Sequence, residues 1–172
     1  MTFDSFIDSI EGSNKTHNLL SLANSRSRLR MTTLYYFASL NNNLVVGTGN
    51  KVEDFGIGFY TKYGDGGVDI SPIADLYKTE VFELAKYLKI NNEILVAKPT
   101  DGLWDDERTD EDQIGASYNE LEWAMKQKEL GKNSLEFKGR EKEVYDILSK
   151  LNKQNLHKMN PIPIYLVPEE LR

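Results

Sequence analysis

Apolar residues recur at the i, i+3, i+4, i+7 spacing of an amphipathic helix in several stretches of the chain. In the longest of them the apolar stripe is formed by Met31, Leu34, Tyr35 and Ala38. A shorter helix is expected within the more polar first sixteen residues, and an extended tail after the last helix. That longest helix is predicted over roughly residues 17–40. Three further helices are predicted, at roughly 76–89, 117–131 and 140–153.

One stretch is typical of a buried strand. The apolar run 44–46 follows the Asn turn 41–43 and leads into the Gly-Thr-Gly segment 47–49. Residues 49–74 and 91–116 are rich in glycine or charge and are predicted as loops. A lone strand cannot form a stable sheet. Either the domain is nearly all helical, or strands of its sheet lie outside these 172 residues.

The composition is that of one folded domain of ordinary size. The chain has 172 residues, of which 40% are apolar and 28% charged. No apolar run approaches the ~20 residues of a membrane span, and the first residues lack the basic and apolar regions of a signal peptide. We therefore expect a cytoplasmic protein with no membrane partner. The absence of cysteine excludes disulfides, thiolate metal sites and a cysteine nucleophile within the chain.

The net charge of −6 argues against general nucleic-acid binding, which needs a basic face. It still permits a small phosphate site, for which a few local cations and backbone N–H groups suffice. Such a site is expected where the strand ends, because ligands of open α/β sheets bind at the carboxyl edge. Thr48 is therefore a candidate nucleotide contact. Glu53 or Asp54 is a candidate Mg²⁺ ligand, since Mg²⁺ takes one or two carboxylates beside phosphate oxygens. A plain turn and a solvated acidic loop remain alternatives.

A second group of candidates surrounds the stretch GFYTKYGDGGVD at 58–69. Its glycines allow backbone N–H groups to approach a ligand closely. Lys62 could contact a phosphate or carboxylate, and Asp69 a ribose or an amine. Lys78 is expected at the start of a helix, where the N–H groups favour an anion. Each of these residues could also be an ordinary surface charge.

Cations at the two ends of the chain are harder to interpret. Arg26 and Arg30 share a face of the long helix, and Arg28 lies roughly on the opposite side. His157 and Lys158 follow the last predicted helix. They could close over an anionic ligand, or only interact favourably with the helix end.

Two helix starts are marked by capping patterns. Ser117 with Glu120 precedes the third long helix, and Thr109 with Asp112 lies inside the dense acidic run 105–113. That run has the composition of a metal site, but acidic stretches are more often solvated loops. The solvated loop is the interpretation that we adopt for it.

The order of these segments is more specific than any one of them. The segments are RLRM at 28–31, LVVGTGNKVE at 44–53, GFYTKYGDGGVDISPIADLYKTEV at 58–81, KPTDGLWDD at 98–106, TDEDQIGASYNELE at 109–122 and NLHK at 155–158. In this order they resemble ammonia-dependent NAD⁺ synthetase, an amide-forming ligase of the N-type ATP-pyrophosphatase group. The likeness covers residues from about 15 to 160. It implies an α/β fold over 1–172, the C-terminal part of a Rossmann-like domain of the adenine nucleotide alpha hydrolase-like (HUP) type. That part is expected to be helix-rich, with a short parallel sheet remnant.

The resemblance implies a reaction in which ATP adenylates the nicotinate carboxylate of deamido-NAD⁺ and ammonia attacks the acyl-adenylate. NAD⁺, AMP and pyrophosphate are the products, and the family is homodimeric. The segment between Glu53 and Lys62 is one residue longer than in some relatives, which leaves Asp54 as a rival metal ligand. The site residues that the resemblance implies are Thr48, Lys78 and Thr100 for ATP, Arg28, Lys62, Asp69, His157 and Lys158 for deamido-NAD⁺, and Glu53 for Mg²⁺.

One family motif is missing from the 172 residues: the Ser-Gly-Gly-x-Asp-Ser phosphate loop, with the second Mg²⁺ carboxylate that it carries. No G-x-x-x-x-G-K-[ST] or G-x-G-x-x-G motif replaces it. We therefore expect the C-terminal part of a synthetase, with little activity alone and with ammonia supplied free or by another polypeptide. The alternative is a non-catalytic or split-subunit interaction module that pairs with a separate N-terminal half. A ligase of the same group with another substrate is a third hypothesis, which the block 62–78 disfavours.

Overall fold

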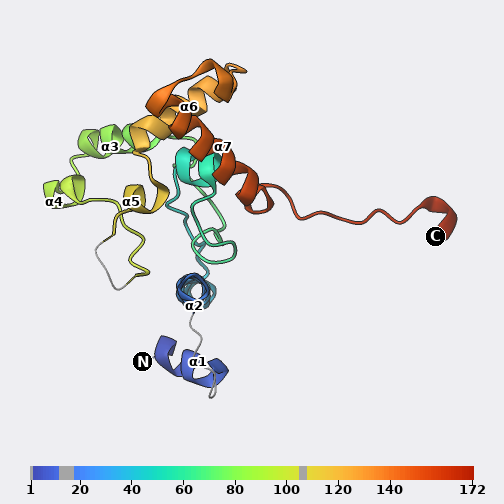
Figure 1. Ribbon diagram of the computed structural model, residues 1–172. Helices are drawn as coiled ribbons and strands as arrows, with labels where there is room; N and C mark the ends of the chain where they lie inside the picture. Colours follow the sequence, from blue (N-terminus) through green and yellow to red (C-terminus); the bar gives the residue numbers. More distant parts are fainter. Residues whose placement is uncertain (1, 12–17, 105–107) are drawn as a thin grey trace.

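The computed structural model describes residues 2–11, 18–104 and 108–172, and helices dominate these parts of the chain (Figure 1). None of the described residues forms a β-strand; one isolated parallel bridge joins Val46 and Ile70. No helix among them is both long and apolar enough to cross a bilayer. The elements are α1 (Thr2–Glu11), α2 (Leu19–Asn41), the π-helix η1 (Val52–Ile57), α3 (Lys78–Tyr87), α4 (Asn92–Val96), α5 (Asp110–Ile114), α6 (Tyr118–Glu129), the 3-10 helix η2 (Ser134–Glu136), α7 (Gly139–Met159) and the 3-10 helix η3 (Glu169–Leu171).

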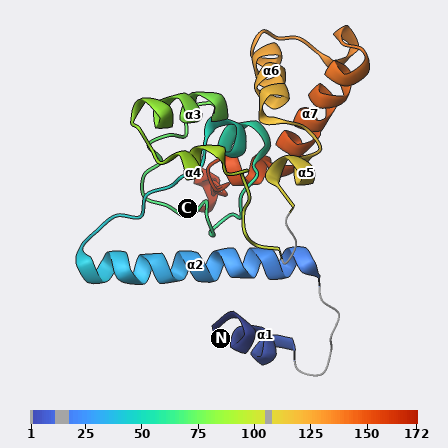
Figure 2. The same cartoon turned by 90° about the vertical axis from the view of Figure 1, so that its left-hand side faces the viewer.

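The long helix α2 lies along one side of the cluster formed by η1 and α3 to α7, and α1 lies on the opposite side of α2 (Figure 2). Irregular segments fill the space between α2 and the cluster (Figures 1 and 2). After α7 the chain runs away from the rest of the molecule as an extended tail, as the sequence predicts (Figure 1).

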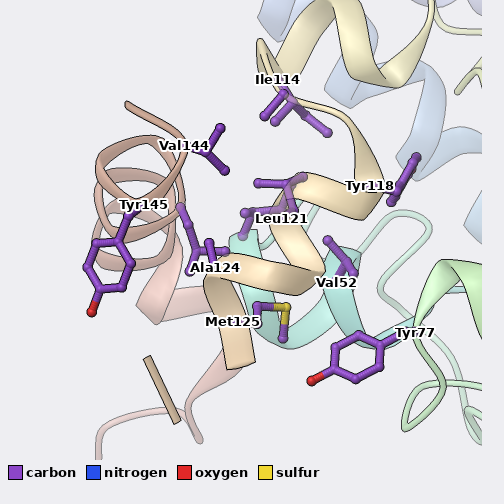
Figure 3. Packing of buried hydrophobic residues seen from close by; sticks show 12 residues of the cluster. Val52, Tyr77, Ile114, Tyr118, Leu121, Ala124, Met125, Val144 and Tyr145 are labelled. Atoms are coloured by element: carbon purple, nitrogen blue, oxygen red, sulfur yellow. The ribbon is translucent and has the colours of Figure 1, made fainter. Parts of the chain in front are cut away.

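The hydrophobic core lies where η1, α6 and α7 meet (Figure 3). Here η1 and α6 approach each other closely. A Cβ atom added at Gly56 would lie only 2.6 Å from the Met125 sulfur, so the contact requires a glycine. The contact lets η1 bury both of its ends against the two long helices. The side chains with at most 1% of their surface exposed in this core are Val52, Ile57, Leu121, Ala124, Val144 and Leu148.

A carboxylate of α6 fixes the start of α3. Glu122 is 4% exposed, and its two oxygens accept hydrogen bonds from the Thr79 amide (3.0 Å) and the Thr79 hydroxyl (2.7 Å). The first N–H groups of a helix have no partner within the helix, so this contact satisfies one of them from the neighbouring helix. Lys78, the first residue of α3 as predicted, is thereby held at a defined place beside the core.

The predicted long helices are confirmed as α2, α3 and α6 within a few residues, and as α7, which continues beyond its predicted end. The turn 41–43 is also confirmed, with Asn42 left-handed at φ 53°. The apolar stripe of α3 is not buried: none of its residues is, and Leu84 and Leu88 are exposed. The predicted ends of the first helical segment, residues 1 and 12–17, lie outside the described residues.

Three sequence predictions about irregular structure are wrong. The expected loop 49–74 contains η1, and the expected loop 91–116 contains the short helices α4 and α5. The expected buried strand 44–46 is reduced to the single bridge at Val46, which is itself 54% exposed. The sheet remnant is not confirmed by the described residues, and nothing in them contradicts it. The segment pairs with residues 69–70, because the Asp69 amide donates to the Val45 carbonyl oxygen (2.9 Å) and the Gly47 amide to that of Ile70 (2.7 Å). A pair of such short segments does not form a stable sheet.

The last helix is longer than the apolar pattern predicts. His157 and Lys158 lie in its final turn and do not follow it, because α7 continues to Met159. Its last turns are stabilised by polar contacts that a hydrophobic pattern does not reveal. Asn152 and Asn155 donate to the carbonyl oxygens of Gly56 (2.9 Å) and Ile57 (2.8 Å).

We predict that Leu121→Ala lowers the free energy of unfolding by about 2–5 kcal/mol, because truncating a fully buried leucine removes apolar contacts and leaves a cavity. Leu135→Ala is the matched control, since Leu135 is 88% exposed. Urea unfolding followed by circular dichroism measures both. Equal effects of the two substitutions would contradict this placement of the core.

Candidate functional site

Two adjoining cavities lie beside α2, and the predicted site residues divide between them. The first, which we name the Lys78 cavity, has a volume of about 490 Å³ and is lined by Thr48, Glu53, Lys78 and Thr100 among others. These are the residues for which the sequence predicts contacts with ATP and Mg²⁺. The structure thus brings all four to one cavity.

The second, the Lys158 cavity, has a volume of about 360 Å³. Arg28, Lys62, His157 and Lys158 line it, and these are four of the residues expected to contact deamido-NAD⁺. The two cavities share part of their walls. The residues that line both are Phe59, Asp65, Asp101 and Leu103.

The loop 58–69 is pinned to α2 by Asp65. Its carboxylate accepts hydrogen bonds from the Ser27 hydroxyl (2.6 Å) and the Thr61 amide (3.0 Å), and its own amide donates back to Ser27 Oγ (3.0 Å). The backbone comes so close that a Cβ at Gly64 would lie 2.2 Å from Ser27 Oγ. Packing on α2 therefore accounts for this glycine without a ligand.

The arginines of α2 hold both cavity walls in place. Arg26 donates to the carbonyl oxygen of Leu103 (2.7 Å) and Arg30 to that of Gly102 (2.9 Å). Arg28 donates instead to the carbonyl oxygen of Lys62 (3.3 Å). The predicted division of the arginines between two faces is confirmed.

The Lys78 cavity contains a cluster of two carboxylates, an ammonium and a phenol. The Tyr118 hydroxyl lies 2.6 Å from Glu53 Oε1 and 3.2 Å from Asp110 Oδ2. Lys78 Nζ lies 3.1 Å from Glu53 Oε1 and 4.9 Å from the centre of the Tyr118 ring. Glu53, Lys78 and Tyr118 come from three different elements, so only the fold brings this cluster together.

Burial shifts the titration of this cluster. Removal from water raises the pKa of Asp110, and the nearby Glu53 charge raises it further, against the opposite effect of the Tyr118 hydrogen bond. Burial, followed by the two carboxylates, also raises the pKa of Tyr118 far above its usual range. Tyr118 is consequently a neutral hydrogen-bond donor at any physiological pH.

Asp110 is the site residue that sequence reasoning missed. It was assigned to the acidic run 105–113, of which residues 105–107 lie outside the described residues. The solvated-loop interpretation is wrong for Asp110, which is 7% exposed and lines the Lys78 cavity. The predicted cap is confirmed, since Thr109 and Asp112 form a capping box at the start of α5. The capping pattern could have indicated the burial of Asp110, because it marks Asp110 as the first residue of a helix, and a helix in a folded domain packs one face on its neighbours.

Asp54, the rival of Glu53, lies elsewhere. It does not line the Lys78 cavity but a smaller one, next to Gly49 and Lys158. Burial raises the pKa of Asp54 to about 6, and the neighbouring Glu53 and Asp65 charges add to the effect. Lys158 is itself half-buried, which lowers the pKa of its ammonium group. The geometry favours Glu53 as the residue nearer to Lys78.

Asp69 lines neither cavity. One of its oxygens accepts from the Val45 amide (2.8 Å) and the other from the Tyr35 hydroxyl (3.1 Å). These contacts tie the segment 44–46 to the glycine-rich loop and to α2. The contact of Asp69 with deamido-NAD⁺ stays a prediction.

A family model described as NAD synthase matches residues 3–162, and the chain therefore belongs to the NAD synthase family. The curated relatives include NH(3)-dependent NAD(+) synthetases. That of Archaeoglobus fulgidus is 43% identical over 149 residues, which cover 87% of this chain and 57% of the relative. That of Thermoplasma acidophilum is 47% identical over 119 residues, which cover 69% of this chain and 47% of the relative. The chain thus spans about half the length of these relatives.

Solved structures agree with the family. The structure of NMN synthetase from Francisella tularensis superposes with a TM-score of 0.76 at 33% sequence identity, covering 98% of this chain and 63% of that one. The expected NAD synthetase-like fold is confirmed at this level.

We predict that Asp54→Asn stabilises the protein at pH 8 by about 1 kcal/mol and has no such effect at pH 4. The raised pKa means that folded Asp54 keeps its proton up to about pH 6, whereas the unfolded residue loses it near pH 4. Stability therefore falls as pH rises through this window, and asparagine removes that loss. The magnitude is discounted because the half-exposed carboxyl is screened by water.

Urea unfolding of both proteins at the two pH values measures the effect. Asp75→Asn is the control, because that side chain is fully exposed at 100%. A pH-independent difference between Asp54→Asn and the wild type would contradict the predicted linkage.

Proposed function

We propose that this chain serves in the ATP-dependent amidation of deamido-NAD⁺ with ammonia, the ligase reaction that yields NAD⁺, AMP and pyrophosphate. One observation carries the proposal. The residues predicted for ATP gather in the Lys78 cavity, and four of the five predicted for deamido-NAD⁺ gather in the Lys158 cavity.

The shared walls of the two cavities suit the chemistry. Adenylation needs the nicotinate carboxylate of one substrate against the α-phosphate of the other, so two separate pockets would not serve. Asp65 and Asp101 line both cavities, which makes them the wall across which the substrates would meet. Such prearrangement of two reactants supplies a large part of a catalysed rate.

In the Lys78 cavity, Thr48, Lys78 and Thr100 are the proposed ATP contacts. Lys78 combines an ammonium group with the start of α3, and both features favour a phosphate. We propose that Glu53 holds Mg²⁺. A bound Mg²⁺ would neutralise the charge that develops on the phosphates.

In the Lys158 cavity, Arg28, Lys62, His157 and Lys158 are the proposed contacts of deamido-NAD⁺. A dinucleotide carries a pyrophosphate, and a cationic lining complements it. Lys62 already donates to the carbonyl oxygen of His157, so the loop 58–69 and the end of α7 approach each other. We propose Asp69 as a further contact, which would require its carboxylate to exchange the Tyr35 hydroxyl for the ligand.

The activity is best tested by mixing the purified chain with a synthetase fragment that carries the Ser-Gly-Gly-x-Asp-Ser phosphate loop. We expect NAD⁺ formation from deamido-NAD⁺, ATP and ammonia in the mixture, and little from either part alone. In the same mixture Lys62→Ala should lower the apparent affinity for deamido-NAD⁺ about tenfold, the size of one lost charged hydrogen bond.

Lys153→Ala is the control, since Lys153 is exposed on α7 away from both cavities. Equal rates for the chain alone and the mixture would refute the need for the loop. Faster turnover of nicotinate mononucleotide than of deamido-NAD⁺ would instead favour the activity named for the Francisella tularensis protein.

A second candidate is an interaction module without activity of its own. It is favoured by apolar side chains in the last turns of α2, where Phe37 and Leu40 are both more than half exposed and line neither cavity. Apolar surface of this kind marks an interface. A second copy of the chain, in a cytoplasmic homodimer, or a separate N-terminal half could cover it.

We predict that sedimentation of the purified chain gives the mass of a dimer, and that Phe37→Asp with Leu40→Asp returns it to a monomer. Charges at the centre of an apolar interface oppose association. Leu135→Asp is the control, because Leu135 is exposed on η2. A monomer that dimerises only on adding the phosphate-loop fragment would favour the separate half.

A further inference from the structure

We propose that Asp110 and Glu53 together form a divalent-cation site, and that the Lys78 ammonium holds the place of the cation until nucleotide binds. The proposal rests on the proposed function only for the choice of a hard cation such as Mg²⁺. It adds to Glu53 a further carboxylate of this chain, on α5.

The two carboxylates converge on one hydroxyl. Tyr118 Oη lies 2.6 Å from Glu53 Oε1 and 3.2 Å from Asp110 Oδ2, so one hydroxyl contacts both acids. Their backbones are held independently, Glu53 within η1 and Asp110 by its amide, which donates to the carbonyl oxygen of Pro99 (3.1 Å). The pair is therefore a fixed feature of the cavity and not a chance meeting of flexible side chains.

The cluster has more acceptors than donors. A tyrosine hydroxyl carries one hydrogen, and the shorter contact assigns it to Glu53. Asp110 Oδ2 then faces an oxygen without a proton, and Asp110 Oδ1 has no hydrogen-bond partner although it is buried. A buried carboxylate without donors is costly. A cation that binds both acids removes this cost.

The donor set suits Mg²⁺ and similar hard ions. Mg²⁺ is commonly held by one or two carboxylates, with water and substrate phosphate completing its shell. Among the described residues no group of three or more His, Cys, Asp or Glu side chains could hold a metal. A two-carboxylate site that needs phosphate oxygens is consistent with that finding.

Lys78 now occupies the position that a cation would take. Its ammonium lies 3.1 Å from Glu53 Oε1 and packs over the Tyr118 ring. With two carboxylates and one ammonium, the cluster keeps an excess negative charge. When a phosphate draws Lys78 away, Glu53 loses its ammonium partner and the cation can replace it. Cation and nucleotide should therefore strengthen each other's binding.

Mn²⁺ titration of the whole 172-residue chain without nucleotide, followed by the electron paramagnetic resonance of free Mn²⁺, tests this inference. We expect Lys78→Met to bind Mn²⁺ at least about tenfold more tightly than the wild type, because it removes the competing cation. Adding Asp110→Asn to Lys78→Met should reverse the gain, and adding Glu53→Gln should do the same. Lys153→Met is the matched control and should change nothing.

Two results would overturn the proposal: Mn²⁺ affinity unchanged by Lys78→Met, or Lys78→Met affinity unchanged by Asp110→Asn. The latter would mean that a proton, and not a metal, satisfies Asp110. Circular dichroism establishes that each variant is folded, and Glu53→Gln keeps the test decisive if Asp110→Asn is not. The titration uses neither deamido-NAD⁺ nor ATP, so its outcome is independent of whether the proposed amidation occurs.

Discussion

The carbonyl oxygens at the end of η1 and in the residues after it accept hydrogen bonds from one side of α7, and the cavities depend on this contact. Asn155 donates to Ile57, and Lys158 donates to both Gly58 (2.8 Å) and Tyr60 (2.7 Å). The last carbonyl groups of a helix lack partners within it, so without α7 these groups would be left unpaired at the start of the loop 58–69. That loop forms a wall of both cavities. The polar end of α7 thus supports the site together with the apolar core.

This dependence explains which parts of the fold the sequence predicts. The helices α2 and α6 follow from local features, an apolar stripe and the Ser117 cap, and both are found where expected. The π-helix η1 could not be predicted, because its hydrogen bonds are completed by side chains about a hundred residues away, such as Asn152 and Asn155. The apolar pattern did not predict the last turns of α7 for the same reason, since polar contacts with distant residues stabilise them.

For the site, the order of the motifs predicts more than local patterns do. Thr48, Glu53, Lys78 and Thr100 are far apart in sequence and come to one cavity. What the motifs cannot give is the pairing of these side chains, such as the contact of Lys78 with Glu53. Nor can they give the burial of Asp110, which depends on Tyr118 and on the chain at Pro99. Composition alone assigns that residue to a solvated acidic run.

The cap of α3 determines which parts of the Lys78 cavity have to move when a ligand enters. Because Glu122 of α6 holds the Thr79 amide, the backbone of Lys78 is anchored to the hydrophobic core and does not have to move. Exchange of its ammonium between Glu53 and a phosphate then requires only rotation about side-chain bonds. Such rotations are much faster than the microsecond-to-millisecond closure of lids and domains. Recognition of a nucleotide by Lys78 would accordingly be limited by diffusion of the ligand into the cavity, and not by a conformational change of the protein.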